Sequence, residues 1–254
     1  MEGILDMSNY KDCNFEVKDT GIRCMYTNAC SLIGKMTELR HRANDFDLMR
    51  ITETWATADI QDAELAIKGF NMFRADRSSS KGGGLLLYVR ENLCTDLMEA
   101  HYKESLWCTV SVGQLNLLVG LIYRAPSSDS SDDNNLLDLL DHAVVQPKMA
   151  HILLLGDFNY PDIDYVHSNV KANDKVSSSR FMDKTHKLFL HQHVCNHTRI
   201  RPGQAPSTLD YIFTDEENVI EQVYHKAPLG KVTTWYLNGS LLYSQRKSVI
   251  MHRS

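Results

Sequence analysis

The stretch from His151 to Tyr160, HILLLGDFNY, constrains the fold more than any other. Its apolar run at 152–155 is too short and too β-prone for a helix, and such a run is typical of a strand buried on both faces. We expect Gly156 to permit a sharp change of direction at the end of this strand. Asp157 and Asn159 follow at once, so a rigid strand would hold a carboxylate and a carboxamide at its end. On spacing alone, an ordinary strand followed by an Asx turn fits equally well.

The composition predicts one large domain or two small ones. The chain has 254 residues, of which 43% are hydrophobic, enough for a sizeable core. No apolar run approaches the roughly 20 residues that a membrane span needs, and the first residues lack the basic start and apolar segment of a signal peptide. The six cysteines are scattered without a CxxC pair, which predicts free thiols. We therefore expect an intracellular protein, cytoplasmic or nuclear, that is not secreted and binds no membrane.

Two more predicted strands deliver a polar residue at their carboxyl ends. The segment 21–28 ends on Asn28, and the segment 46–52 is followed directly by Glu53. Ligand sites in α/β proteins tend to lie at such strand ends, which favours a shared site. The net charge of −5 argues against a protein that coats nucleic acid by charge alone. It is compatible with an enzyme whose acidic pocket is offset by a bound cation.

The remaining pattern predicts a strand-rich α/β protein without internal repeats. Helices are expected over 31–43, with Ser31 as the N-cap, over 132–147 and over 181–192. A polar loop is expected over 161–179.

Three further features each have a structural and a functional interpretation. The glycines at 82–84 follow their lysine instead of preceding it, so they fit a turn better than a phosphate-binding loop. Asp210 interrupts an apolar strand and must be either hydrogen-bonded structurally or functional, because an unpaired acid there is costly. Four histidines raise the possibility of zinc, but the spacing lacks a cysteine pair or HExxH motif, so helix-end and loop positions are the better explanation: His186, His191, His193 and His197.

The polar positions also occur in a familiar order. Asn28, the Glu-Thr-Trp triplet at 53–55, Tyr123-Arg124, Gly-Asp-Phe-Asn at 156–159 and Ser-Thr-Leu-Asp at 207–210 follow one another as in the endonuclease/exonuclease/phosphatase superfamily. The chain resembles in particular the endonuclease domain of LINE-type retrotransposons. Each motif alone is weak, whereas the ordered set is specific. The resemblance implies a single α/β domain built as a four-layer sandwich, with two packed sheets flanked by helices.

The resemblance also implies a chemistry. Glu53 would hold Mg²⁺ or Mn²⁺, a hard cation suited to carboxylate and water ligands, and Asn28 would help to orient the metal site. Asp157 would orient or deprotonate the attacking water. Asn159 and Tyr123 would donate to the phosphate, so that metal and donors stabilise the developing charge.

Further residues complete the expected site. Arg124, Ser207 and Arg199 are candidates for binding DNA phosphates, although a solvated basic loop is the commoner explanation for Arg199. In the family, Asp210 holds a histidine that steadies the transition state.

The sequence departs from the family pattern after residue 231. The family closes with Ser-Asp-His, but this chain has Val-Thr-Thr at 232–234 and no acidic residue after Glu221. Its only histidine after residue 231 is His252. We therefore expect a loose lead-in over 1–20, a truncated domain over 21–231 that lacks its last core strand, and a non-homologous, unstructured tail over 232–254. Asp210 is expected to lack its partner.

Three functions follow as alternatives. The chain is a metal-dependent DNA-nicking phosphodiesterase with impaired activity, or an inactive retroelement remnant that binds nucleic acid or protein. A phosphatase acting on a small molecule is the third. Losing one member of a catalytic set commonly costs orders of magnitude in rate while binding survives. DNA preference, oligomeric state and fusion to a reverse transcriptase are left open.

Overall fold

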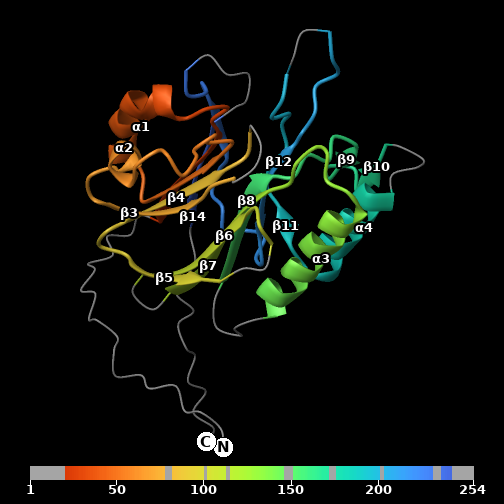
Figure 1. The fold of residues 1–254 in the computed structure, drawn as a ribbon. Helices are drawn as coiled ribbons and strands as arrows, with labels where there is room; N and C mark the ends of the chain where they lie inside the picture. Colours follow the sequence, from red (N-terminus) through yellow and green to blue (C-terminus); the bar gives the residue numbers. More distant parts are fainter. Residues whose placement is uncertain are drawn as a thin grey trace, which may run out of the picture.

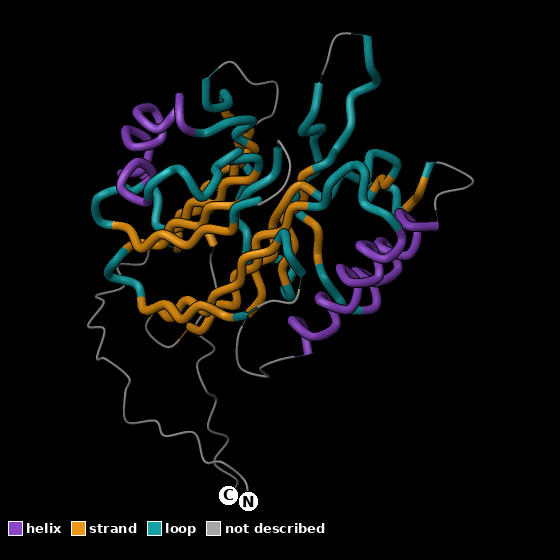
Figure 2. The backbone as a smooth tube through the Cα atoms, in the orientation of Figure 1, coloured by secondary structure: helices purple, strands orange, loops and turns teal. Residues whose placement is uncertain are grey.

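The computed structural model describes residues 21–77, 82–99, 102–112, 115–145, 151–171, 176–200, 203–230 and 236–241. Two six-stranded sheets pack face to face, with helices on the outer side of each (Figures 1 and 2). The expected four-layer α/β sandwich is therefore confirmed. Among these residues, no helix combines the length and the apolar character that crossing a membrane requires.

The first sheet contains the amino-terminal strands. β1 and β2 run parallel, and the other neighbouring pairs run antiparallel. The strand order is β13 (Tyr224–Lys226), β14 (Tyr236–Leu241), β1 (Ile22–Asn28), β2 (Leu48–Thr52), β4 (Leu85–Arg90) and β3 (Phe70–Ala75).

The second sheet contains the GDFN strand, β8, near its centre. β7 and β8 run parallel, and the remaining neighbours are antiparallel. The strand order is β11 (His191–Gln192), β12 (Asp210–Thr214), β8 (His151–Asp157), β7 (Leu115–Tyr123), β6 (Ser105–Val112) and β5 (Cys94–Met98). A separate pair, β9 (Ile163–Asp164) and β10 (Asn169–Val170), lies in the loop after β8.

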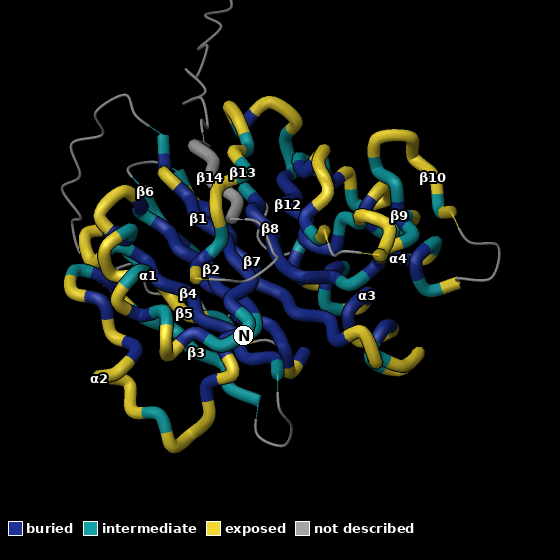
Figure 3. Tube along the Cα trace, turned by 90° about the horizontal axis from the view of Figure 1, so that it is seen from above, coloured by how far each residue is buried: buried dark blue, intermediate teal, exposed yellow. Residues whose placement is uncertain are grey.

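Buried side chains form three layers of core. Leu48 and Leu87 of the first sheet belong to one cluster with Val119 and Leu153 of the second. A second cluster joins the first sheet to its helices, and a third joins the second sheet to α3 and α4. Because helices cover both outer faces, the central strands are buried along nearly their whole length (Figure 3). This explains why β8 reads as a continuous apolar run.

The helices of the first sheet begin later than expected. A 3-10 turn at Ile33–Lys35 precedes α1 (Met36–Arg42), and a second follows at Ala43–Asp45. Ser31 has a φ of +79° and does not cap the helix, so that prediction was wrong. The other helix on this side, α2 (Asp62–Leu65), is a single turn.

On the second sheet, the expected helix α3 (Ser130–Val145) is confirmed. Asp129 caps its first turn, because its Oδ1 accepts hydrogen bonds from the backbone N–H groups of residues 131 and 132 at 2.9 Å. α4 (Val176–Lys187) begins five residues before the expected 181 and ends before 192. Its buried positions, Ser178, Phe181 and Thr185, share one face at helical spacing. The polar composition of its first turn hid that face from the sequence pattern.

The largest correction concerns the segment after residue 231. Residues 236–241 were expected to be unstructured, yet they form β14, which pairs antiparallel with β1 from Ile22↔Leu241 to Thr27↔Tyr236. Backbone groups along β1 need partners whatever side chains the neighbouring strand carries. The sheet therefore has the last strand that the departure from the family pattern seemed to remove.

The cysteine prediction needs a smaller correction. Cys24, Cys30, Cys108 and Cys195 carry free thiols as expected. Cys94, however, is disulfide-bonded. Sequence spacing cannot reveal such a pairing, because a disulfide depends on proximity in space.

Arg50 is a costly feature of the core. Its side chain lies on β2 with no exposed surface, and none of its three guanidinium nitrogens has a hydrogen-bond partner. Burial lowers its pKa, and the thiols of Cys24 and Cys108 are its influential neighbours. An uncompensated buried charge destabilises a fold by several kcal/mol.

We predict that Arg50→Leu raises the free energy of unfolding by about 1–4 kcal/mol, because the variant removes an unpaired charge and retains apolar contact. Urea titration measures this. Arg90→Leu in the same sheet is the matched control and should be destabilising, since Arg90 donates to the carbonyls of Phe46, Ala43 and Asn44. Equal or lower stability of Arg50→Leu would contradict the prediction.

Candidate active site

The candidate site forms where strand ends from both sheets meet. Parallel pairing places Asn28 beside the end of β2, and it places Tyr123 beside Asp157. β12 runs antiparallel to β8, so Asp210 begins its strand directly opposite Asp157. Asn28 Nδ2 donates to Asp157 Oδ2 at 2.9 Å and thereby bridges the two sheets. The structure thus brings together four of the residues singled out from the sequence.

Gly156 has a different role from the one expected. β8 continues through it to Asp157 without a turn. A Cβ at this position would lie 1.9 Å from the carbonyl oxygen of Ile122 on β7. Glycine is therefore required for close approach of two backbones, and that approach carries Asp157 to the edge of the sheet.

Asp157 and Asp210 are deeply buried acids. They are 5% and 2% exposed. Burial raises the pKa of Asp157 well above its usual range, and the neighbouring charges of Asp210 and Glu53 raise it further. Burial also raises the pKa of Asp210 to about 6. Oδ1 of Asp157 has no hydrogen-bond partner.

Glu53 is held by its neighbours in a constrained backbone. Both Glu53 and Trp55 have left-handed conformations, with φ of +54° and +55°, which cost energy in a non-glycine residue. The indole of Trp55 donates to Glu53 Oε2 at 2.5 Å, and the backbone N–H of Gly83 donates to the same oxygen at 3.0 Å. The glycine run at 82–84 therefore forms a turn that holds the carboxylate.

Tyr123 completes the cluster around Glu53. It is buried, and its pKa is raised by burial and then by a hydrogen bond to Glu53. The phenol and the carboxylate thus come from different sheets and meet at the same edge.

Asp210 is hydrogen-bonded, which was one of the two alternatives expected for an acid in an apolar strand. The hydroxyl of Tyr26 donates to its Oδ1 at 2.6 Å. Its backbone N–H donates to Oγ1 of the buried Thr198 at 3.2 Å. Asn28 is also fully engaged, since its Oδ1 accepts from the backbone N–H and the thiol of Cys30 at 3.2 and 3.1 Å.

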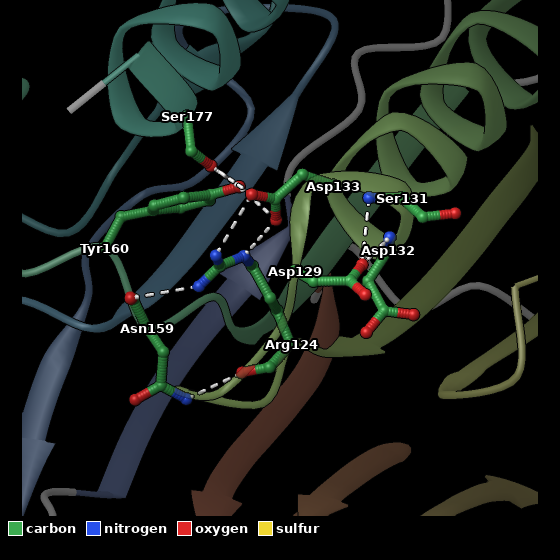
Figure 4. A network of polar contacts seen from close by, with 8 residues as sticks. All are labelled: Arg124, Asp129, Ser131, Asp132, Asp133, Asn159, Tyr160 and Ser177. Carbon is green, nitrogen blue, oxygen red and sulfur yellow. Dashed lines mark hydrogen bonds and ion pairs between the residues drawn. The ribbon is translucent and has the colours of Figure 1, made fainter.

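Arg124 lies in a buried network (Figure 4). Its Nε and Nη2 donate to the two carboxylate oxygens of Asp133 at 2.6 and 3.3 Å, and its guanidinium lies 4.1 Å from the ring centre of Tyr160. Ser177 of α4 also donates to Asp133. The backbone carbonyl of Arg124 accepts a hydrogen bond from the side chain of Asn159 at 2.8 Å. Arg124 therefore ties the loop after β8 to α3.

A cavity of about 680 Å³ adjoins Asn159. It lies between the first turns of α3 and α4, and Arg124, Arg180 and Arg199 contribute to its wall. Ser207 is outside the lining; it forms a β-bridge with Arg199, which holds the hairpin that presents this arginine.

The acidic edge suits a divalent cation. Asp157 offers an unpartnered buried oxygen beside two more carboxyl groups that disfavour its charge. A hard cation with oxygen ligands would relieve both costs.

The histidines give no comparable cluster. Within the described ranges, the metal-ligand grouping is instead His151, Asp215 and Glu216, with atoms within 4.8 Å of one another. His151 begins β8 whereas Asp157 ends it, so this grouping lies at the opposite end of the strand from the candidate site. His193 is engaged with Thr214 Oγ1 at 2.6 Å.

The fold and these motifs place the chain in a class of proteins. The model of the endonuclease/exonuclease/phosphatase family matches residues 26–230, so the chain belongs to that family. No curated protein sequence matches it significantly.

Solved structures agree on the fold. The endonuclease domain of TRAS1, a telomere-specific non-LTR retrotransposon, is 14% identical with a TM-score of 0.65, covering 88% of this chain and all of that one (100%). The AP endonuclease LMAP from Leishmania major is 12% identical with a TM-score of 0.69, covering 93% and 92%. The 3′ phosphatase NExo from Neisseria, bound to product DNA hairpin, is 12% identical with a TM-score of 0.59, covering 87% and 99%.

Sequence reasoning missed the supporting side chains. Tyr26 and Asn28 are two residues apart on one strand, so period-two alternation would have placed them on the same face. Thr198 and Asp133 gave no such signal, because the conformation of the loops that join them to Asp210 and Arg124 cannot be read from the sequence.

We predict that Gly156→Ala destabilises the protein by about 3 kcal/mol or more, because backbone atoms of β7 cannot yield to the new Cβ. Thermal or urea unfolding measures the loss. Gly34→Ala is the matched control, since nothing lies within 4 Å of a Cβ there. Similar stability of the two variants would disprove the close-approach explanation.

The buried His193 should make stability depend on pH. Burial, and then the charge of His191, lowers its pKa from 6.5 to about 4. Between these values the unfolded chain binds more protons than the folded one, so stability falls as pH is lowered.

Relative to His193→Gln, we expect the wild-type protein to lose on the order of 2 kcal/mol of stability between pH 7 and pH 4. Chemical denaturation at several pH values checks this, with the exposed His142→Gln as a control. Parallel pH profiles for wild type and His193→Gln would rule out the assignment.

Proposed function

We propose that this chain is a metal-dependent phosphodiesterase that nicks DNA, with Asp157 at the centre of its site. The observation that carries the proposal is the buried, unpartnered Oδ1 of Asp157, set beside Asp210 and Glu53. Such an arrangement is unfavourable in itself and becomes favourable when a cation and a water molecule occupy it.

Glu53 would hold Mg²⁺ or Mn²⁺ beside Asp157, and this cation would supply positive charge that stabilises the phosphate oxygens in the transition state. Asn28 then has a different part from metal binding. Both ends of its carboxamide are already used, one by Cys30 and the other by Asp157. We propose that it fixes the orientation of the Asp157 carboxylate.

The remaining groups act on water and phosphate. Asp157 accepts a proton as the water oxygen bonds to phosphorus and the bond to the departing sugar oxygen breaks. Asn159 has a left-handed backbone (φ +50°) and is anchored through Arg124, which prepares its amide to donate to the phosphate. Tyr123 already donates its one proton to Glu53, so we propose that it holds this carboxylate in place and reaches a phosphate oxygen only if that hydrogen bond is released.

DNA as the substrate is supported by the family and by two arginines in the adjoining cavity. Arg180 and Arg199 place guanidinium groups in its wall near Asn159, where they can contact phosphate oxygens, although the same wall contains Asp129, Asp133 and Asp162. Ser207 would act indirectly by holding Arg199 in place. Arg124 is committed to Asp133 and is proposed to position Asn159 instead of binding phosphate itself.

We also propose that turnover is slow, because Val-Thr-Thr at 232–234 replaces the Ser-Asp-His of the family pattern. A missing member of a catalytic set typically costs orders of magnitude in rate.

The test is nicking of supercoiled plasmid with Mg²⁺. We expect slow conversion to open circles that stops with chelator and in Asp157→Ala. The control variant Asp138→Ala removes an acid from α3 outside the site and should nick normally. Cleavage that is equal in wild type and Asp157→Ala would refute the proposal.

Two alternatives make different predictions in the same assay. A binding remnant would retain DNA affinity without any cleavage above the Asp157→Ala level; the lost Ser-Asp-His motif favours it. A small-molecule phosphatase would release phosphate from a nucleotide or a lipid phosphate while leaving the plasmid intact.

A further inference from the structure

Tyr26 occupies a position that the proposed chemistry does not yet use. It lies on β1, is 1% exposed, and its hydroxyl lies 2.6 Å from Asp210 Oδ1 and 3.1 Å from Thr52 Oγ1. The three residues come from three strands, β1, β2 and β12. The contacts therefore cross from one sheet to the other directly beneath the acidic edge.

The direction of these hydrogen bonds follows from proton count. A phenol has one proton, and Tyr26 donates it to the carboxylate of Asp210. Thr52 must then be the donor in its own contact with Tyr26. Thr52 immediately precedes Glu53 in the chain. The hydrogen bonds from Thr52 to Tyr26 and from Tyr26 to Asp210 therefore connect the backbone next to Glu53 with the carboxylate of Asp210.

We infer that Tyr26 is a positioning residue for the phosphodiesterase reaction and holds Asp210 in place of an imidazole. A carboxylate that accepts a short hydrogen bond from a buried phenol is fixed in one rotamer. Asp210 lies opposite Asp157 in the strand register, so this restraint fixes the second acid at the centre of the site. The inference rests on the proposed function.

A purely structural role is the competing explanation, since a buried phenol always needs a partner. Tyr88 provides a matched control for that role. It is a fully buried tyrosine on β4 of the same sheet, and its hydroxyl donates to the carbonyl of Leu65 at 2.7 Å. Its side chain belongs to the outer core, between the first sheet and its helices.

The experiment compares Tyr26→Phe with Tyr88→Phe in Mg²⁺-dependent nicking. We expect Tyr26→Phe to lower kcat about 10–100-fold, the usual loss when the partner of a catalytic or metal-binding group is removed, with KM for DNA within about twofold. Tyr88→Phe should leave both constants near wild type, although both variants lose thermal stability to a similar extent.

A double mutant tests whether Tyr26 acts through Asp210. In an Asp210→Asn background, Tyr26→Phe should add less than about a twofold further loss of kcat, because residues in one network are not additive. A full additional loss would overturn the inference.

The remaining outcomes are distinguishable. If the wild-type protein is active and the kcat of Tyr26→Phe is within about twofold of it, the role of Tyr26 is overturned and the proposed function stays intact. The same holds if the kcat of Tyr26→Phe is no lower than that of Tyr88→Phe. Wild-type protein that does not nick above Asp157→Ala overturns both.

Discussion

Two hydrogen bonds between the sheets hold the two buried acids of the candidate site in place. Asn28 and Tyr26 project from one face of β1 and reach Asp157 and Asp210 on the opposite sheet. A sandwich of two sheets can slide or twist at its interface, because apolar contacts have no direction. Directional bonds at the edge remove that freedom where the chemistry requires a fixed geometry.

The same edge shows why acids can be kept in a buried place. Asp157 and Asp210 face each other across neighbouring strands, and each has a raised pKa because burial disfavours its charge. Asn28, Tyr26 and Thr198 offset part of that cost by donating or by ordering the backbone nearby. The part of the burial cost that these contacts do not offset lies at Oδ1 of Asp157, which has no hydrogen-bond partner. Stability is therefore lost where binding can restore it, as is common at functional sites.

Much of this arrangement could be predicted from the sequence. The apolar run before Asp157 indicated a strand buried on both faces, and polar residues at strand ends indicated one shared edge. The prediction failed where distant segments decide the outcome. Gly156 looked like a turn because its neighbour on β7 is invisible in the sequence. Arg124 looked available for phosphate because Asp133 lies on a helix whose packing the sequence does not give. The hydrogen-bond partner of Asp210 could not be named from the sequence, because Tyr26 precedes it by 184 positions.

β14 separates what the fold needs from what the site needs. The strand lies between β1 and β13 and completes their backbone pairing, and peptide groups supply that pairing whatever side chains they carry. A segment of altered sequence can therefore close the sheet as long as it can be extended and contains no proline where an N–H is needed. Without it, β1 would present an open edge to other molecules, which is a route to aggregation. Selection on solubility would thus act on substitutions in β14, and selection on catalysis would act on substitutions at Asp157. The sequence of β14 and the sequence around Asp157 can therefore diverge at different rates.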